Sequence, residues 1–115
     1  MSLATARNLD HPEPEAIRLE AVLHALSDPM RLRIVRFLAS LPLGEEAACS
    51  AIDLVVSKST TTHHFRVLRE AGVIVQVYRG TAKMNRLRRE DLDTLFPGLV
   101  DTVLDADTRQ RERAD

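Results

Sequence analysis

Hydrophobic residues near the start of the chain recur with the period of a helix. Four of them are spaced i, i+3, i+4 and i+7: Leu19, Val22, Leu23 and Leu26. This spacing places them on one face, and we predict a helix over residues 15–26. Asp28 and Pro29 then supply a capping acceptor and a residue already fixed at helical φ, so a second helix begins there. Pro42 and Gly44 end it.

The segment of residues 45–56 has a weaker pattern. Its apolar residues are Ala47, Ala48, Ile52, Leu54, Val55 and Val56. We interpret this segment as a short helix that runs into an extended turn. A third helix follows, with Ser57 or Ser59 as its cap and Gly72 as the residue that ends it.

The helix after Ser57 has two distinct faces. The inner face is predicted to contain Thr61, His64, Phe65 and Leu68. The opposite face, by the period of 3.6 residues, contains Ser59, Thr62, His63, Arg66 and Glu70. This outward face is polar and basic, without bulky apolar side chains.

The hydrophobic period changes from 3.6 to 2 after Gly72, which is typical of a strand. Alternation over residues 73–78, a turn at Gly80 and a short segment over residues 82–87 predict a β-hairpin. Helical spacing resumes over residues 90–95. A last apolar stripe follows, made of Leu99, Val100, Val103 and Leu104.

The length of 115 residues fits one domain. We expect a flexible arm over residues 1–14, a folded domain over 15–105 and a charged tail over 106–115 that frays. No apolar run approaches the roughly 18 residues that span a membrane, and no secretory signal is visible. The lone Cys49 agrees with a reducing cytosol, so we expect a cytoplasmic protein without membrane contact.

Charge is unevenly distributed along the chain. The 16 Lys and Arg nearly balance the 17 Asp and Glu, which gives a net charge of −1. Residues 57–89, however, contain eight basic residues and one acidic residue, a charge of +7, so the remainder carries −8. Such asymmetry predicts a localised face that binds a polyanion.

Helices followed by an arginine-rich hairpin predict a mainly α fold with a β-hairpin (α+β), a winged helix-turn-helix. The major groove of B-DNA accepts one helix with a polar, basic outer face. The expected base-reading residues are Ser57, Lys58, Ser59, Thr60, Thr62, His63 and Arg66. Those expected to contact the DNA backbone, mainly from the wing, are Arg69, Arg79, Gly80, Lys83 and Arg86.

Two segments resemble the ArsR/SmtB-type repressors: ALSDPMRLRIV at residues 25–35 and SKSTTTHHFRVLREAGVI at residues 57–74. The resemblance implies a homodimeric prokaryotic repressor that binds a palindromic operator in double-stranded DNA. It also implies that Arg31 anchors a structural ion pair. In the family the first and last helices pair across the dimer, which here assigns to the interface Leu19, Val22, Leu23, Leu26, Leu99, Val100, Val103 and Leu104.

The chain departs from the metal-sensing members of that family. Where they carry Cys-x-Cys it has only Cys49, and its last helix has aspartates but no His or Cys. Zinc and softer metals require several N or S donors, so we expect no metal site and no cofactor. A small buried hydrophobic role is favoured for Cys49 over a thiol sensor. The sequence leaves open whether the protein responds to a small-molecule inducer at all.

Two other functions are alternatives to a DNA-binding repressor. A winged helix can serve as a protein–protein interaction module without specific DNA binding, and DNA binding at low salt discriminates between the two. An enzyme is disfavoured, because no phosphate loop, nucleophile elbow or paired acidic site can be assembled from the sequence.

Overall fold

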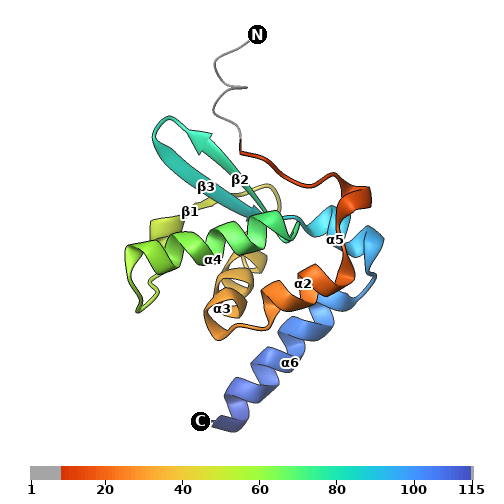
Figure 1. Ribbon diagram of the computed structural model, residues 1–115. Helices are drawn as coiled ribbons and strands as arrows, with labels where there is room; N and C mark the ends of the chain where they lie inside the picture. Colours follow the sequence, from red (N-terminus) through yellow and green to blue (C-terminus); the bar gives the residue numbers. More distant parts are fainter. Residues whose placement is uncertain (1–8, 115) are drawn as a thin grey trace.

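The computed structural model describes residues 9–114 and contains helices packed on a three-stranded antiparallel sheet (Figure 1). In chain order the elements are η1 (Pro14–Ala16), α2 (Leu19–Leu26), α3 (Pro29–Ala39), β1 (Ala47–Ala48), η2 (Cys49–Ala51), α4 (Lys58–Glu70), β2 (Ile74–Arg79), β3 (Ala82–Leu87), α5 (Arg89–Leu95) and α6 (Leu99–Ala114). The predicted α+β winged helix-turn-helix fold is confirmed.

Local capping signals set the start of α3. The Asp28 side chain accepts hydrogen bonds from the backbone N–H of Met30 and Arg31, at 2.9 and 3.1 Å. Pro29 occupies the first helical position, as predicted. The preceding helix is shorter than expected, because residues 14–16 form a separate 3-10 turn before α2 begins at Leu19.

The sheet has the strand order β1-β3-β2, with the predicted hairpin formed by β2 and β3. Its register pairs Gln76 with Asn85 and Tyr78 with Lys83. Alternation therefore gives the hairpin two faces. The inner face, toward α4, has Ile74, Gln76, Tyr78, Lys83, Asn85 and Leu87; the outer face has Val75, Val77, Arg79, Ala82, Met84 and Arg86.

The core lies between the helices and the inner face of the sheet. Its fully buried apolar side chains are Val22, Ile34, Val35, Phe65, Leu68, Val73, Ile74 and Leu92. The predicted inner residues of α4, His64, Phe65 and Leu68, are buried there, and Thr61 is half-buried. Burial of one face of α4 leaves its other face at the surface.

The prediction for residues 45–56 was wrong in part. A two-residue strand pairs Ala47 with Asn85, and the helical portion is a single 3-10 turn, η2. The open edge of β3 offers backbone hydrogen bonds that this short alanine-containing segment satisfies by pairing.

The last helix does not fray after Asp105 as predicted but continues to Ala114. Ion pairs at spacing i, i+4 join Asp105 to Arg109 and Asp107 to Arg111, and such pairs stabilise an exposed helix. Figure 1 shows α6 leading away from the domain, on the side away from the hairpin.

The expected arm lies partly outside the described residues, which begin at Leu9. His11 lies beside the edge of β2, where its Nε2 accepts a hydrogen bond from the Gln76 backbone N–H at 3.0 Å. Within residues 9–114, no helix is long and apolar enough to cross a membrane.

Candidate nucleic-acid interface

The N-terminus of α4 is capped by a serine and lies exposed to solvent. The Ser57 hydroxyl accepts a hydrogen bond from the Thr60 N–H at 3.2 Å and donates one to the Thr60 hydroxyl at 2.9 Å. Ser57, Lys58 and Ser59 are exposed. The first turn thus presents the positive end of the helix dipole beside the Lys58 ammonium, an arrangement suited to a phosphate.

The outward face of α4 carries the predicted base-reading side chains. Thr62, His63 and Arg66 are exposed, and Thr60 is half-buried. Arg66 donates from Nη2 to His63 Nδ1 at 3.2 Å, and the Thr62 hydroxyl donates to the Lys58 carbonyl at 3.0 Å. The face therefore offers a guanidinium and an imidazole side by side, both capable of donating to base edges.

The inner face of α4 is fixed by a buried hydrogen bond between His64 and Arg31. Arg31 donates from Nη1 to His64 Nδ1 at 3.1 Å and from Nε to the Ala25 carbonyl at 2.7 Å. Because a guanidinium only donates, His64 accepts at Nδ1 and carries its proton on Nε2. Burial lowers the pKa of His64 below its ordinary value of 6.5; the Asp28 carboxylate opposes that shift and the charge of Arg31 adds to it.

The ion pair expected for Arg31 is not formed. Its partners are His64 and backbone carbonyls at the end of α2, and no carboxylate lies within ion-pair distance among the described residues. The Ala25 carbonyl lies at the end of α2, where no further helical N–H is available, and the buried arginine satisfies it; the His24 carbonyl also accepts from the Ser27 N–H and hydroxyl.

The wing presents Lys83 and Tyr78 on the same face of the hairpin as α4. Lys83 Nζ lies 5.8 Å from the centroid of the Tyr78 ring, within the range of a cation–π contact. Sequence reasoning missed Tyr78. The signal was available, because a turn at Gly80 in this register places Tyr78 opposite Lys83.

Arg79, at the tip of the wing, is paired with Glu46. Its Nε and Nη2 donate to the two carboxylate oxygens at 3.2 and 3.0 Å, and Gly80 beside it is exposed with φ of +64°. The hydrogen bond from Arg79 holds the pKa of Glu46 below its ordinary value. The guanidinium at the exposed tip therefore already forms an ion pair with the Glu46 carboxylate.

Arg69 is not displayed at the surface with the other expected backbone contacts. Its side chain is 13% exposed, and its Nη1 donates to Gln76 Oε1 at 2.7 Å. Gln76 Nε2 in turn donates to Asn85 Oδ1 at 2.7 Å, and Asn85 donates to the Ala47 carbonyl and to Cys49 Sγ. Arg69 therefore joins α4 to the sheet, and the half-buried Cys49 belongs to the same network.

Arg86 is also separated from the α4 surface. The register pairs it with Val75 on the outer face of the hairpin, opposite the face that carries Lys83. The structure therefore groups Arg66, His63 and Lys83 on one side and leaves Arg86 on the other.

The residues expected at a dimer interface divide into two groups. Val22, Leu26 and Val100 are buried within the single chain, which corrects their assignment to an intermolecular surface. The apolar stripe of α2 covers more of the helix surface than a dimer contact alone would need, so Val22 and Leu26 pack inside the domain. Leu19 and Leu23 are 42% and 45% exposed, while the half-buried residues of α6 are Leu99, Val103 and Leu104.

The described side chains form no cluster suited to a metal ion. Over residues 9–114, no three His, Cys, Asp or Glu residues lie together in a way that could hold a metal ion.

Comparisons with known proteins agree with this geometry. A family described as a helix-turn-helix domain matches residues 26–77. The chain is 33% identical over 84 residues to YceK of Bacillus subtilis (strain 168), described as an uncharacterized HTH-type transcriptional regulator. This alignment covers 71% of the chain and 82% of YceK.

Solved structures show the same fold. An ArsR family transcriptional regulator superposes with a TM-score of 0.57 at 18% identity, over 91% of this chain and 95% of that one. A possible transcriptional regulator for arsenical resistance gives 0.57 at 26% identity, over 81% and 97%. The transcriptional repressor BigR from Xylella fastidiosa gives 0.51 at 23% identity, over 68% and 85%.

Proposed function

Because the chain belongs to the helix-turn-helix transcriptional regulators and has the winged fold of the ArsR type, we propose that it acts as a homodimeric repressor on a palindromic operator. It is a DNA-binding regulator; repression, the dimer and the operator's symmetry are the proposal. We place it in the cytoplasm, in contact with chromosomal DNA, and infer that a small molecule relieves its binding.

The observation that carries the proposal is the shared side of α4 and the wing. In this arrangement Arg66, His63 and Thr62 enter the major groove and contact base edges. Ser57, Lys58, Ser59 and Thr60 hold the start of the helix on a phosphate. Lys83, Arg79 and Gly80 contact the neighbouring backbone from the wing.

The proposed dimer uses the exposed part of the two end helices. Leu19 and Leu99 line one shallow hollow together with Phe96 and Pro97, so α2 and α6 present apolar surface at the same place. A two-fold axis there would give two copies of α4. They would read half-sites about one helical turn of DNA apart, roughly 34–36 Å.

The test is a salt titration of DNA binding with the purified protein, using fluorescence anisotropy of a labelled duplex and light scattering for the mass. With ~6 to 10 phosphate contacts per dimer, affinity should fall by ~10³ or more between 50 and 200 mM salt. A dimer that binds no duplex at 50 mM salt would favour a protein–protein interaction module instead.

A further inference from the structure

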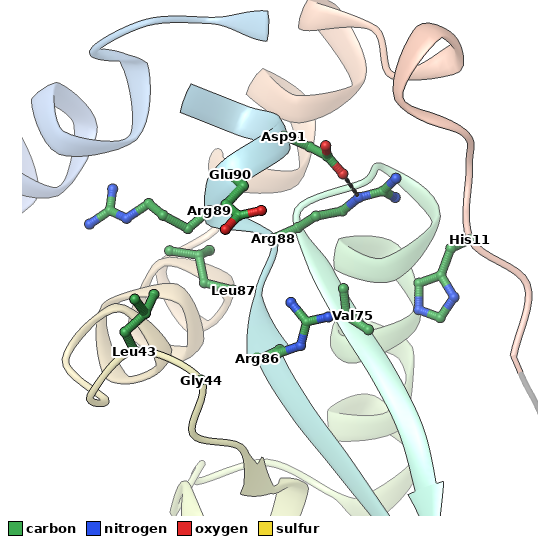
Figure 2. A pocket seen from close by; sticks show the side chains of 10 residues that line it. All are labelled: His11, Leu43, Gly44, Val75, Arg86, Leu87, Arg88, Arg89, Glu90 and Asp91. Carbon is green, nitrogen blue, oxygen red and sulfur yellow. Dashed lines mark hydrogen bonds and ion pairs between the residues drawn. The ribbon is translucent and has the colours of Figure 1, made fainter. Parts of the chain in front are cut away.

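A cavity of about 540 Å³ lies on the outer face of the hairpin, away from α4 (Figure 2). His11 closes one side, Leu43 and Gly44 lie on the other, and residues 88–91 at the start of α5 close the end. Val75 and Arg86 form its floor. The proposed DNA-binding face does not include it.

Arg86 supplies a positive charge to this cavity, and the same charge contributes to the lowered pKa of Glu46. Figure 2 shows the Arg86 guanidinium standing between Val75 and Leu43. It makes no hydrogen bond or ion pair with another residue in the range 9–114, whereas Arg88 is bonded to Asp91 at 2.7 Å and Arg89 to Asp101 at 2.9 Å. A ligand's anionic group would therefore meet Arg86 without breaking an existing ion pair.

The walls around Arg86 combine apolar side chains with charged ones, and the charged ones include the carboxylates of Glu90 and Asp91. Val75 lines the cavity from β2, and Leu43 opposite it is 94% exposed, whereas Leu87 at the end of β3 is buried. A ligand with an apolar body would cover Leu43 and gain free energy from the apolar surface removed from water. An inorganic anion would leave this surface in water.

His11 is a fixed neutral wall in this structure. Its Nε2 accepts from the Gln76 N–H at 3.0 Å, so its Nδ1 is protonated and donates to the Leu9 carbonyl at 2.9 Å. Burial lowers the pKa of His11, and the charges of Arg69, Arg88 and Arg86 lower it further. The imidazole therefore adds an aromatic surface, and the attraction for an anion comes from Arg86.

We propose that this cavity binds a small organic anion with one carboxylate and an apolar body, the carboxylate pairing with the Arg86 guanidinium. A carboxylate and a guanidinium form two parallel hydrogen bonds, which fixes the orientation of the ligand. The apolar body then lies against Val75 and Leu43. Binding of this anion does not depend on the proposed repressor function.

The test is an NMR titration of the full chain with sodium benzoate at constant ionic strength. The amide signals of Val75, Arg86 and Glu90 should shift and saturate, with a Kd on the order of 1 mM. Arg86→Gln should raise that Kd at least tenfold. Arg109→Gln, which removes an exposed arginine on α6 paired with Asp105, should leave it unchanged.

Two comparisons on the unmodified chain separate charge from apolar contact. Benzyl alcohol, which lacks the carboxylate, and inorganic phosphate, which lacks the apolar body, should each bind at least tenfold more weakly than benzoate. The proposal is overturned if benzoate gives no saturable shift, if Arg86→Gln binds it as well as the unmodified chain, or if either comparison compound matches it. Loss of DNA affinity in Arg86→Gln without benzoate binding would instead identify Arg86 as a phosphate contact.

Discussion

Arg31 and His64 show how single side chains orient α4, the proposed DNA-reading helix. Arg31 is buried and reaches from α3 to the carbonyls of His24 and Ala25 at the end of α2, and to His64 on α4. The His24 carbonyl also accepts from the Ser27 N–H and hydroxyl, but the Ala25 carbonyl and His64 Nδ1 would lose their hydrogen bond, at a cost of about 1–3 kcal/mol per buried group. The position of α4 relative to α2 therefore depends on one guanidinium.

Acid should weaken this connection through His64. Its pKa in the folded chain lies below the ordinary value of 6.5, so its stabilising contribution is complete above pH 6.5 and is lost as the pH falls through the folded-state pKa. We expect the free energy of unfolding to decrease more between pH 7.5 and 5 in the unmodified chain than in His64→Gln. Urea unfolding at each pH measures this, and parallel pH profiles would contradict the assignment.

Arg66 is expected to contribute base specificity as well as affinity. It is exposed beside His63 on the outward face of α4. Arg66→Ala should weaken binding to the operator by ~1 to 3 kcal/mol and change the preferred bases, because a bidentate contact to guanine is lost. Selection from a random duplex library measures both effects. Arg109→Ala is the matched control, and an unchanged base preference in Arg66→Ala would exclude direct readout by this residue.

At the scale of elements, the sequence predicted best where the signal is local. Asp28, followed by Pro29, caps one helix, and Ser57 caps another. Each cap bonds to a residue two or three positions further on, so the local sequence suffices to identify it. The hairpin likewise follows from a turn at Gly80. The strand at Ala47 depends on pairing with Asn85, 38 residues away, and no pattern near Ala47 indicates that partner.

Placement of the basic side chains could not be read from composition alone. The basic segment contains Arg69, Lys83 and Arg86. The strand register places Lys83 and Arg86 on opposite faces of the hairpin, and the Arg69 side chain is hydrogen-bonded to Gln76. A shift of one residue in register would exchange those faces. The contact of His11 with Gln76 spans 65 residues and was equally invisible.

The junction between α4 and β2 requires glycine for two separate reasons. Gly72 has φ of +87°, and a Cβ there would lie 2.7 Å from Ile17 Cγ1 in the core. Gly44 has the same φ with nothing within 4 Å. Gly44→Ala should cost about 1–2 kcal/mol of unfolding free energy for the backbone alone, and Gly72→Ala clearly more. Equal losses in urea unfolding would show that Ile17 moves aside freely.

At the scale of the whole molecule, several acidic residues outside the basic segment form ion pairs within the chain. Asp101 pairs with Arg89, and Asp105 pairs with Arg109 on the helix surface. Asp107 joins α6 to α3 through Arg36 at 2.7 Å. Much of the negative charge outside the basic segment therefore holds the molecule together.

Asp107 should matter more for stability than its neighbour Asp105. The Asp107 side chain is 8% exposed, and its loss leaves Arg36 without its carboxylate. Asp107→Asn should lower the free energy of unfolding by about 1–3 kcal/mol. Asp105→Asn, which breaks an exposed pair, should cost at most about 1 kcal/mol. Urea unfolding of both variants decides, and equal effects would mean that the α3–α6 pair adds nothing.

In the pairing of Arg79 with Glu46, the Glu46 carboxylate occupies the position on the Arg79 guanidinium that a DNA phosphate would take. If Arg79 contacts DNA in the proposed complex, it must exchange one anion for another, so the contact adds little net attraction. A randomly approaching duplex competes with a carboxylate already bonded through both oxygens. Only a DNA backbone held in place by α4 would keep a phosphate beside Arg79 long enough to replace Glu46. The ion pair therefore favours correctly aligned DNA over DNA that is bound at random.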